Sequence, residues 1–344
     1  MRVKLLILFA FACAPFWALA QGFAGLGQTS EGFALPDPEK ALEFPTDDGA
    51  HPDFRIEWWY ITATLSDSQG RDFGVQWTLF RNSLSPDDGT GWQSSQVWMA
   101  HAAVTTADFH SFDEKLARAE VGQVGVVPEP FSAWIDDWEF TSLKGQPNAF
   151  SLRAAGSDFA YDLTLQDDGQ RIFHGKNGYP EKSADGQASR YFSRPYLKAA
   201  GTISIGSETF EVSGEAWLDR EWSSQALAGN QSGWDWFGLT LDNGSRLMAA
   251  RVRSDQSSFL FGTLMDKSGT SISLGASDIA IAPDANNLPP THWSLKVPDH
   301  GVDLSVRALN PNAWTGSLIE YWEGPVSVEG SHQGRGYLEM TGYR

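Results

Sequence analysis

The feature that most constrains the fold of this chain is an internal repeat of aromatic, strand-forming sequence. Residues 58–65 (WWYITATL) align without gaps with residues 234–241 (WDWFGLTL), 176 positions further on. Each copy is followed by a turn of Asp, Asn and Gly and by a second strand ending in arginine, at Arg81 and at Arg251 or Arg253. Apolar runs joined by such turns predict antiparallel hairpins, one opening each half of the chain.

A second match lies near the end of each half. Residues 191–214 and 321–342 both carry an aromatic pair, a proline, a glycine and a closing triplet, VSG or MTG. Either match alone could be a chance similarity between aromatic strands, but both occur in the same order. A tandem duplication is therefore expected, with domains at 51–216 and 217–344 and a boundary near Ala216.

The rest of the chain is rich in short strand-forming runs, and no long segment repeats every 3.6 residues. A stretch at 111–120 is expected to form a short helix. Two antiparallel sheets of this length must close or be covered, because open edges are prone to aggregate. The expected fold is all-β, with two barrels that hold one apolar ligand or fill with side chains. Strands are expected at residues 73–80, 97–105, 150–154, 159–165, 201–205, 209–216, 236–241, 246–253, 258–265, 293–297, 302–307, 325–329 and 336–341.

The N-terminus has the pattern of a signal peptide over residues 1–20. It begins with basic residues, continues with an apolar run too short to span a bilayer and ends at an Ala-Leu-Ala cleavage site. Residues 21–50 are expected to form a leader segment. Cys13, the single cysteine, suggests lipid anchoring as an alternative, but the leucine usual three residues earlier is missing. The protein is therefore expected to be exported, to the periplasm rather than outside the cell.

The net charge of the chain limits the kinds of partner that it is expected to bind. Twenty-five Lys and Arg stand against 43 Asp and Glu, which gives a formal net charge of −18. Such a balance argues against nucleic acid and against anionic membrane surfaces, both of which attract basic stripes. Solubility outside the cell is the simplest reason for the excess of acid.

Familiar catalytic motifs are missing from the sequence. It has no G-x-S-x-G, no H-E-x-x-H, no Cys/His cluster and no phosphate-binding glycine loop before a helix. We therefore expect no nucleophile elbow, no metal and no cofactor. Of seven scattered histidines, His101 stands out because it lies between apolar strand residues.

Three clusters combine acids with aromatic residues, at 55–60, 217–225 and 320–323. Alternate residues of a strand share a face. Within the second cluster Trp217, Asp219 and Glu221 should therefore point one way, and Leu218, Arg220 and Trp222 the other. The candidate acid or base residues are Asp219 and Glu221. The residues expected to contact a ligand are Glu57, Trp59, Tyr60, His101, Arg220, Trp222, Gln225, Trp234, Asp235, Trp236, Tyr321 and Glu323.

The second cluster has two interpretations. A carboxyl desolvated among aromatic rings has a raised pKa and can act as a general acid, while the ring faces shelter a cationic intermediate. Alternatively, Arg220 pairs with Asp219 or Glu221 in an ionic belt that locks the domains together. The guanidinium would then lower the carboxyl pKa and oppose the acid role.

At these residues the chain resembles the family of AttH-like proteins and carotenoid 1,2-hydratases, a group also described as predicted secreted hydrolases. The resemblance rests on 51–60, 217–225, 233–237 and 321–339, and it covers the chain from about residue 40 onwards. It implies two tandem lipocalin-like (calycin) barrels. The hydratases of the family add water to an isoprenoid double bond by an acid-initiated reaction.

The hydratase motif Asp-His-Asn-Trp matches this sequence at Asp219 and Trp222, whereas Arg220 replaces the histidine. Three functions follow from the residues and the resemblance together. The protein binds or modifies a hydrophobic, lipid-like or isoprenoid-like molecule at the mouth between the domains, or it hydrates an isoprenoid double bond. Alternatively, because some relatives are encoded with ABC-type permease components, it is a non-catalytic accessory of such a transporter. The oligomeric state is not predicted.

Overall fold

The computed structural model describes residues 30–146, 148–225, 227–254, 257–284, 288–316 and 319–343. The described elements are β-strands and three short 3-10 turns, η2 (Thr46–Asp48), η3 (Gly91–Gln93) and η4 (Pro298–His300). Within these residues, no helix is long and apolar enough to cross a membrane. The predicted signal peptide at 1–20, Cys13 and the start of the leader lie outside the described residues.

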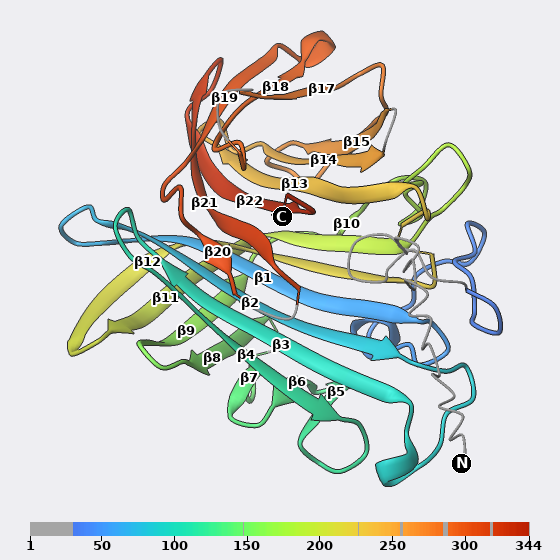
Figure 1. Cartoon of the computed structure of the whole chain (residues 1–344). Coiled ribbons are helices and arrows are strands. Elements are labelled where there is room, and N and C mark those ends of the chain that lie inside the picture. Colours follow the sequence, from blue (N-terminus) through green and yellow to red (C-terminus); the bar gives the residue numbers. More distant parts are fainter. Residues whose placement is uncertain are drawn as a thin grey trace, which may run out of the picture.

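The first domain is a curled antiparallel sheet of 12 strands, drawn in blue to yellow in Figure 1. Short β10 (Ile172–Phe173) pairs with β11 beside the main path. In spatial order the remaining strands are β4 (His110–Arg118), β3 (Gln96–Thr105), β2 (Asp72–Ser83), β1 (Ile56–Asp67), β12 (Glu208–Ser223), β11 (Arg190–Ile205), β9 (Phe159–Asp167), β8 (Ala149–Ala155), β7 (Trp138–Ser142), β6 (Phe131–Ile135) and β5 (Val124–Pro128).

The second domain is a similar sheet of 10 strands, drawn in orange to red above the first (Figure 1). Short β20 (Trp314–Thr315) pairs with β21. The other strands, in spatial order, are β16 (Ser271–Leu274), β15 (Ser258–Met265), β14 (Arg246–Ser254), β13 (Gln231–Leu241), β22 (Gly334–Thr341), β21 (Tyr321–Gly330), β19 (Val302–Ala308), β18 (His292–Val297) and β17 (Ala280–Pro283).

The two sheets have the same strand order, which confirms an all-β fold of two repeated barrel-like domains. Strands β13–β16 take the places of β1–β4, and β22 and β21 those of β12 and β11. Even the short strands agree, since β20 pairs with β21 as β10 pairs with β11. Among the described strands of the second sheet none corresponds to β5 or β6, which agrees with its shorter middle.

Two sequence expectations are corrected. The expected boundary near Ala216 falls inside β12, which continues in the first sheet to Ser223; the second sheet begins at Gln231. The expected helix at 111–120 is the edge strand β4, paired along its length with β3. The sequence of β4 contains charged residues, which are typical of exposed sheet edges. They interrupt the alternation of apolar and polar residues by which a strand is recognised.

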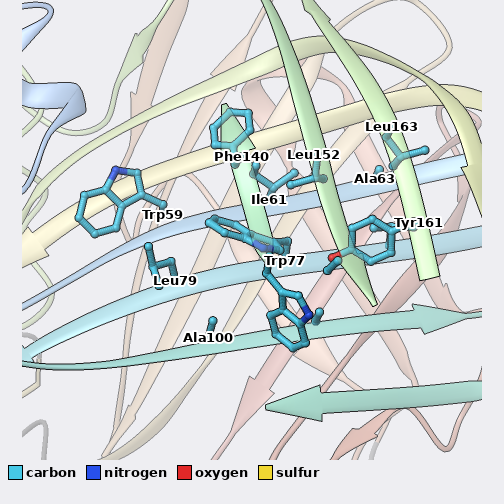
Figure 2. Close-up of a cluster of buried hydrophobic side chains, with 14 of the residues drawn as sticks. Trp59, Ile61, Ala63, Trp77, Leu79, Ala100, Phe140, Leu152, Tyr161 and Leu163 are labelled. Carbon is cyan, nitrogen blue, oxygen red and sulfur yellow. The ribbon is translucent and has the colours of Figure 1, made fainter. Parts of the chain in front are cut away.

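The interior of the first barrel is filled by side chains. Alternate residues of β1 point inward, and Trp59, Ile61 and Trp77 are at most 1% exposed. Figure 2 shows them gathered with Phe140 and Leu152 from the opposite wall. Burying each such side chain contributes about 1.5–3 kcal/mol to stability. A small molecule therefore has to bind elsewhere than in the centre of this barrel.

The opposite, outward face of β1 and β2 packs against β21 and β22 of the second domain. Figure 1 shows these two layers crossing in the middle of the molecule. Gly74 allows the close approach, because a Cβ atom there would lie 2.6 Å from Pro325 Cγ and from the Tyr337 hydroxyl. Each barrel thus presents one sheet face to the other.

Replacing Gly74 with alanine should therefore loosen the contact between the domains. Overpacking of this kind costs about 1–3 kcal/mol in the free energy of unfolding, measured by urea titration. Gly229→Ala is the matched control, because a Cβ there meets no atom within 4 Å. Equal stability of the two variants would show that the faces are not closely packed at Gly74.

Candidate functional site

A cavity of about 290 Å³ lies between the two barrels. Strands β1–β3 and β12 supply one wall, and β13–β15 and β22 supply the other. Most of its surface is apolar. Its large aromatic side chains include Trp58, Tyr60, Phe80, Trp234, Trp236 and Phe261. Its ionisable and polar side chains include Asp219, Glu221, Lys182, His101, Tyr321 and Glu339.

Strand β12 delivers the acidic groups to this cavity. Asp219 and Glu221 line it, and Trp217 on the same face packs against Trp236 across the interface, with ring centroids 6.1 Å apart. The intervening residues Leu218 and Arg220 point into the first domain. The alternation expected from the sequence places both carboxyls on the cavity side.

Three donors hold the Asp219 carboxyl, which is only 3% exposed. The Tyr191 hydroxyl donates to Oδ2 over 2.6 Å, and Trp217 Nε1 donates to Oδ1 over 2.6 Å. The Ser193 hydroxyl also donates to Oδ1. Tyr191 in turn accepts a 3.0 Å bond from Trp236 Nε1, which links the carboxyl to the second domain.

A histidine extends this chain of hydrogen bonds. His174 Nε2 lies 2.6 Å from the Ser193 hydroxyl and Nδ1 lies 2.8 Å from the Thr263 hydroxyl. Since Ser193 donates to Asp219, Nε2 donates to Ser193 and Nδ1 accepts from Thr263. Burial, reinforced by the charge of Lys182, lowers the pKa of His174 to about 3, so the ring is neutral.

Burial dominates the electrostatics of Asp219. Desolvation raises the pKa of its carboxyl to about 7, although the bonds from Ser193, Tyr191 and Trp217 oppose the shift. The charge of nearby Glu221 contributes to the same upward shift. Near neutral pH a large fraction of Asp219 therefore carries a proton, as a general acid requires.

Glu221 is in a different electrostatic position, because it forms an ion pair with Lys182. The Lys182 ammonium also lies 5.7 Å from the centre of the Trp58 ring and 5.9 Å from that of Tyr191. Two carboxyls that are neighbours on one face of β12 thus differ in chemistry. Asp219 is partly protonated near pH 7, whereas Glu221 is paired with a cation.

The second domain adds two further carboxyls to the interface. Glu339 faces the cavity from β22 and accepts a 2.7 Å bond from Trp234 Nε1. Glu323 lies beside it on β21, close to the hydroxyls of Tyr60 and Tyr321. Burial raises the pKa of both groups, and each of them is close to other acids.

Several residues expected at the site lie elsewhere. Arg220 does not pair with Asp219 or Glu221, as the ionic-belt interpretation requires. It forms an ion pair with Glu57, which also binds Arg81, and it stacks 3.8 Å above Trp59. Glu57, Trp59, Arg220 and Trp222 lie on β1 and β12 of the first domain, and they do not appear among the cavity-lining residues.

Two more expected contacts are also displaced. Asp235 binds Arg251 and Arg253, at 2.7 and 3.4 Å, on the face of β13 opposite to the cavity. The Gln225 side chain lies 3.4 Å from Ser30 in the leader. The expected residues that the structure brings to the cavity are Asp219, Glu221, Tyr60, His101, Trp234, Trp236 and Tyr321, with Glu323 packed behind them.

Sequence reasoning missed His174, Lys182, Tyr191, Ser193 and Glu339. Tyr191 was visible only as one member of the repeated aromatic pair. Glu339 had a usable signal, because it faces Trp236 as Asp219 faces Tyr60, and the repeat aligns Tyr60 with Trp236. Within the described residues there is no group of three or more His, Cys, Asp or Glu that could hold a metal ion.

The chain belongs to the AttH-like family, whose model matches residues 35–343. An AttH protein from Nitrosomonas europaea, known from a crystal structure, has 33% sequence identity to this chain. The two structures align with a TM-score of 0.79 over 91% of this chain and 100% of that one. A search of curated protein sequences gave no match.

Two more distant structures share the fold. Kievitone hydratase from Nectria haematococca is 14% identical, with a TM-score of 0.65 over 90% of this chain and 98% of its own. CghA in complex with Sch210972 is 13% identical, with a TM-score of 0.52 over 92% of this chain and 97% of its own. At these identities the likeness concerns the fold alone.

The raised pKa of Asp219 makes a prediction about stability. A carboxyl whose pKa rises from 3.8 to about 7 on folding stabilises the protein fully only below about pH 4. That contribution is lost as the pH rises to about 7, at a cost on the order of 4 kcal/mol. Asp219→Asn should therefore flatten the decline in unfolding free energy between about pH 4 and pH 7.

Urea unfolding across this pH range measures the effect, and the exposed Asp168→Asn provides the control. The unfolding free energy of the control should equal that of the wild type at every pH. If the unfolding free energy of Asp219→Asn has the same pH dependence as that of the wild type, the carboxyl does not hold a proton in the folded protein.

Proposed function

We propose that the cavity between the barrels binds an apolar, unsaturated small molecule and that Asp219 protonates its double bond to begin the addition of water. The observation that carries this proposal is a buried carboxyl with a pKa near 7 facing an aromatic cavity. Hydration requires a proton donor that remains protonated near neutral pH and a surface that tolerates a carbocation.

The surroundings of Asp219 suit the step that follows protonation. When the proton moves to carbon, Asp219 becomes a carboxylate, and the three donors already aimed at it stabilise the new charge. The positive charge develops in the substrate beside the rings of Tyr60 and Trp236, whose electron-rich faces stabilise a cation. Groups that are in place before the reaction thus stabilise both the negative charge on Asp219 and the positive charge on the substrate.

The position of Arg220 removes an objection to this role. The histidine of the hydratase motif is replaced by Arg220, but position 220 faces the first domain and binds Glu57. A change at that position therefore leaves the cavity face of β12 intact. The name of the distant structural relative kievitone hydratase adds support for a hydratase on this fold, at the level of the fold only.

Export and partners stay predictions of the sequence. We propose that the protein acts in the periplasm after removal of residues 1–20. Carriage of a hydrophobic molecule, without chemistry, would use the same cavity and is separated from hydration by the experiments below. The accessory role beside an ABC-type permease also stays a prediction of the sequence.

The reaction can be tested with farnesol, an acyclic isoprenoid with trisubstituted double bonds, in water enriched in oxygen-18. The wild type should form a labelled tertiary alcohol, detected by mass spectrometry. Asp219→Asn should reduce its formation by about 10²–10⁴-fold, because it removes the acid. Asp168→Asn should react as the wild type does. Equal rates for Asp219→Asn and the wild type would exclude Asp219 as the proton donor.

Binding can be tested separately from chemistry. Ala250 lines the cavity on β14, so Ala250→Phe should fill part of it and weaken farnesol binding, followed by quenching of tryptophan fluorescence. Ala280→Phe, at an exposed position of β17, is the control. Asp219→Asn should bind farnesol like the wild type. If Asp219→Asn binds and the wild type forms no alcohol, the protein is a carrier.

A further inference from the structure

A second group able to move protons lies on the same cavity wall as Asp219, three strands away. The strand register places Asp219 opposite Tyr60, Tyr60 opposite Thr78, and Thr78 opposite His101, in one row across the sheet. Because neighbouring strands are about 4.8 Å apart, Asp219 and His101 are separated by three strand spacings, or about 14 Å at the backbone. A small molecule that lies along this wall can contact both groups.

His101 connects a partly exposed carboxyl to a hydroxyl of the other domain. Its Nε2 lies 3.1 Å from Glu114 Oε2 on β4, and its Nδ1 lies 2.6 Å from the Tyr321 hydroxyl on β21. The His101 side chain is fully buried, whereas that of Glu114 is 19% exposed. Both His101 and Tyr321 line the cavity, so the chain runs from near the surface to the space between the barrels.

The chemistry of the three groups sets the direction of the bonds. A carboxylate only accepts, so Nε2 of His101 donates to Glu114 and Nδ1 accepts the Tyr321 hydroxyl proton. A carboxylate, an imidazole and a hydroxyl in this order form the arrangement by which enzymes activate a hydroxyl. Here Tyr321 is the hydroxyl, and its oxygen lone pairs remain able to accept a proton from another molecule.

We propose that Glu114, His101 and Tyr321 form a proton relay that deprotonates the water added to the substrate. The inference rests on the proposed hydration. Asp219 gives its proton to one carbon, and the water oxygen bonds to the resulting cation. One water proton passes to the Tyr321 oxygen as the Tyr321 proton passes to Nδ1 of His101. The product is a neutral alcohol, with a carboxylate at Asp219 and an imidazolium beside Glu114, and both are reset by exchange with solvent.

The internal repeat argues against a purely structural role for His101. In the second domain Trp236 faces Ala250 and Ala250 faces Phe261, so Phe261 occupies the position that corresponds to His101. The fold thus accepts an apolar ring at this position. In the first domain a histidine stands there with both ring nitrogens bonded, between the rings of Phe80 and Phe112 at 5.3 and 5.1 Å.

The test compares two isotopic labels in farnesol. Protonation by Asp219 followed by return to the alkene leaves deuterium from heavy water in recovered farnesol. Capture by water gives an alcohol that contains oxygen-18. The ratio of labelled alcohol to deuterated alkene reports the relay and does not depend on how fast Asp219 protonates the substrate.

Tyr321→Phe should lower this ratio about 100-fold, and Glu114→Gln about tenfold or more, while deuterium exchange persists. Glu139→Gln, at a partly exposed position of β7 outside the cavity lining, is the control and should keep the wild-type ratio. Glu114→Gln is close in shape to the wild type and partly exposed, so it keeps the test valid if Tyr321→Phe fails to fold.

The pH profile separates a relay from a packing effect. The groups that face His101 are Glu114 and Tyr321, and Glu323 and Glu339 lie behind Tyr321. Burial lowers the pKa of His101 and Glu114 opposes that shift. The ratio should therefore fall at acid pH as His101 becomes protonated, and this fall should move to lower pH in Glu114→Gln.

The outcomes are distinct. If Glu114→Gln and Tyr321→Phe keep the wild-type ratio and pH profile while the wild type forms alcohol, the relay is overturned and the proposed hydration stands. If the wild type gives neither deuterated alkene nor labelled alcohol, the hydration of such an alkene fails, and the relay fails with it.

Discussion

The alternation of side chains along β12 is the constraint on which the other features of the site depend. Arg220 points into the first domain, where it binds Glu57, packs on Trp59 and donates to the Gly49 carbonyl of the leader. Asp219 points the other way, into the cavity, where it accepts only neutral hydrogen bonds. Because the guanidinium and the carboxyl lie on opposite faces of one strand, the cation is used for stability and cannot depress the pKa of the acid. A shift of one residue in register would exchange their environments.

The duplication creates a binding site between the two barrels. An isolated barrel of this kind would expose the outer face of β1, β2 and β12, which carries Tyr60, Trp217 and Asp219. In the pair, the corresponding strands of the second domain cover that face and contribute Trp236 and Glu339. Burial between the domains raises the carboxyl pKa values, so the site exists only when the barrels are docked. The cost is several buried acids with few cations nearby, a loss of stability that functional sites commonly carry.

Much of the fold was open to prediction from the sequence, because strand alternation and the repeat are local patterns. The orientation of Asp219 and Glu221 followed from the same alternation. The partners did not follow, because they depend on register between distant strands. Arg220 and Glu57 are 163 residues apart, and His101 and Tyr321 are 220 apart. His174 lies outside the regular strands, in a segment without a motif, and its two partners, Ser193 and Thr263 of the other domain, are 19 and 89 residues away in the sequence.

The central claim is that a buried carboxyl between the barrels holds a proton at neutral pH, and infrared spectroscopy of the folded protein tests it most directly. A protonated carboxyl has a carbonyl stretching band that is separate from those of carboxylates and moves in heavy water. The difference between the spectra of the wild type and Asp219→Asn at pH near 7 should contain this band, and it should fade as the pH is raised. A difference spectrum that contains only carboxylate bands at that pH would contradict the account.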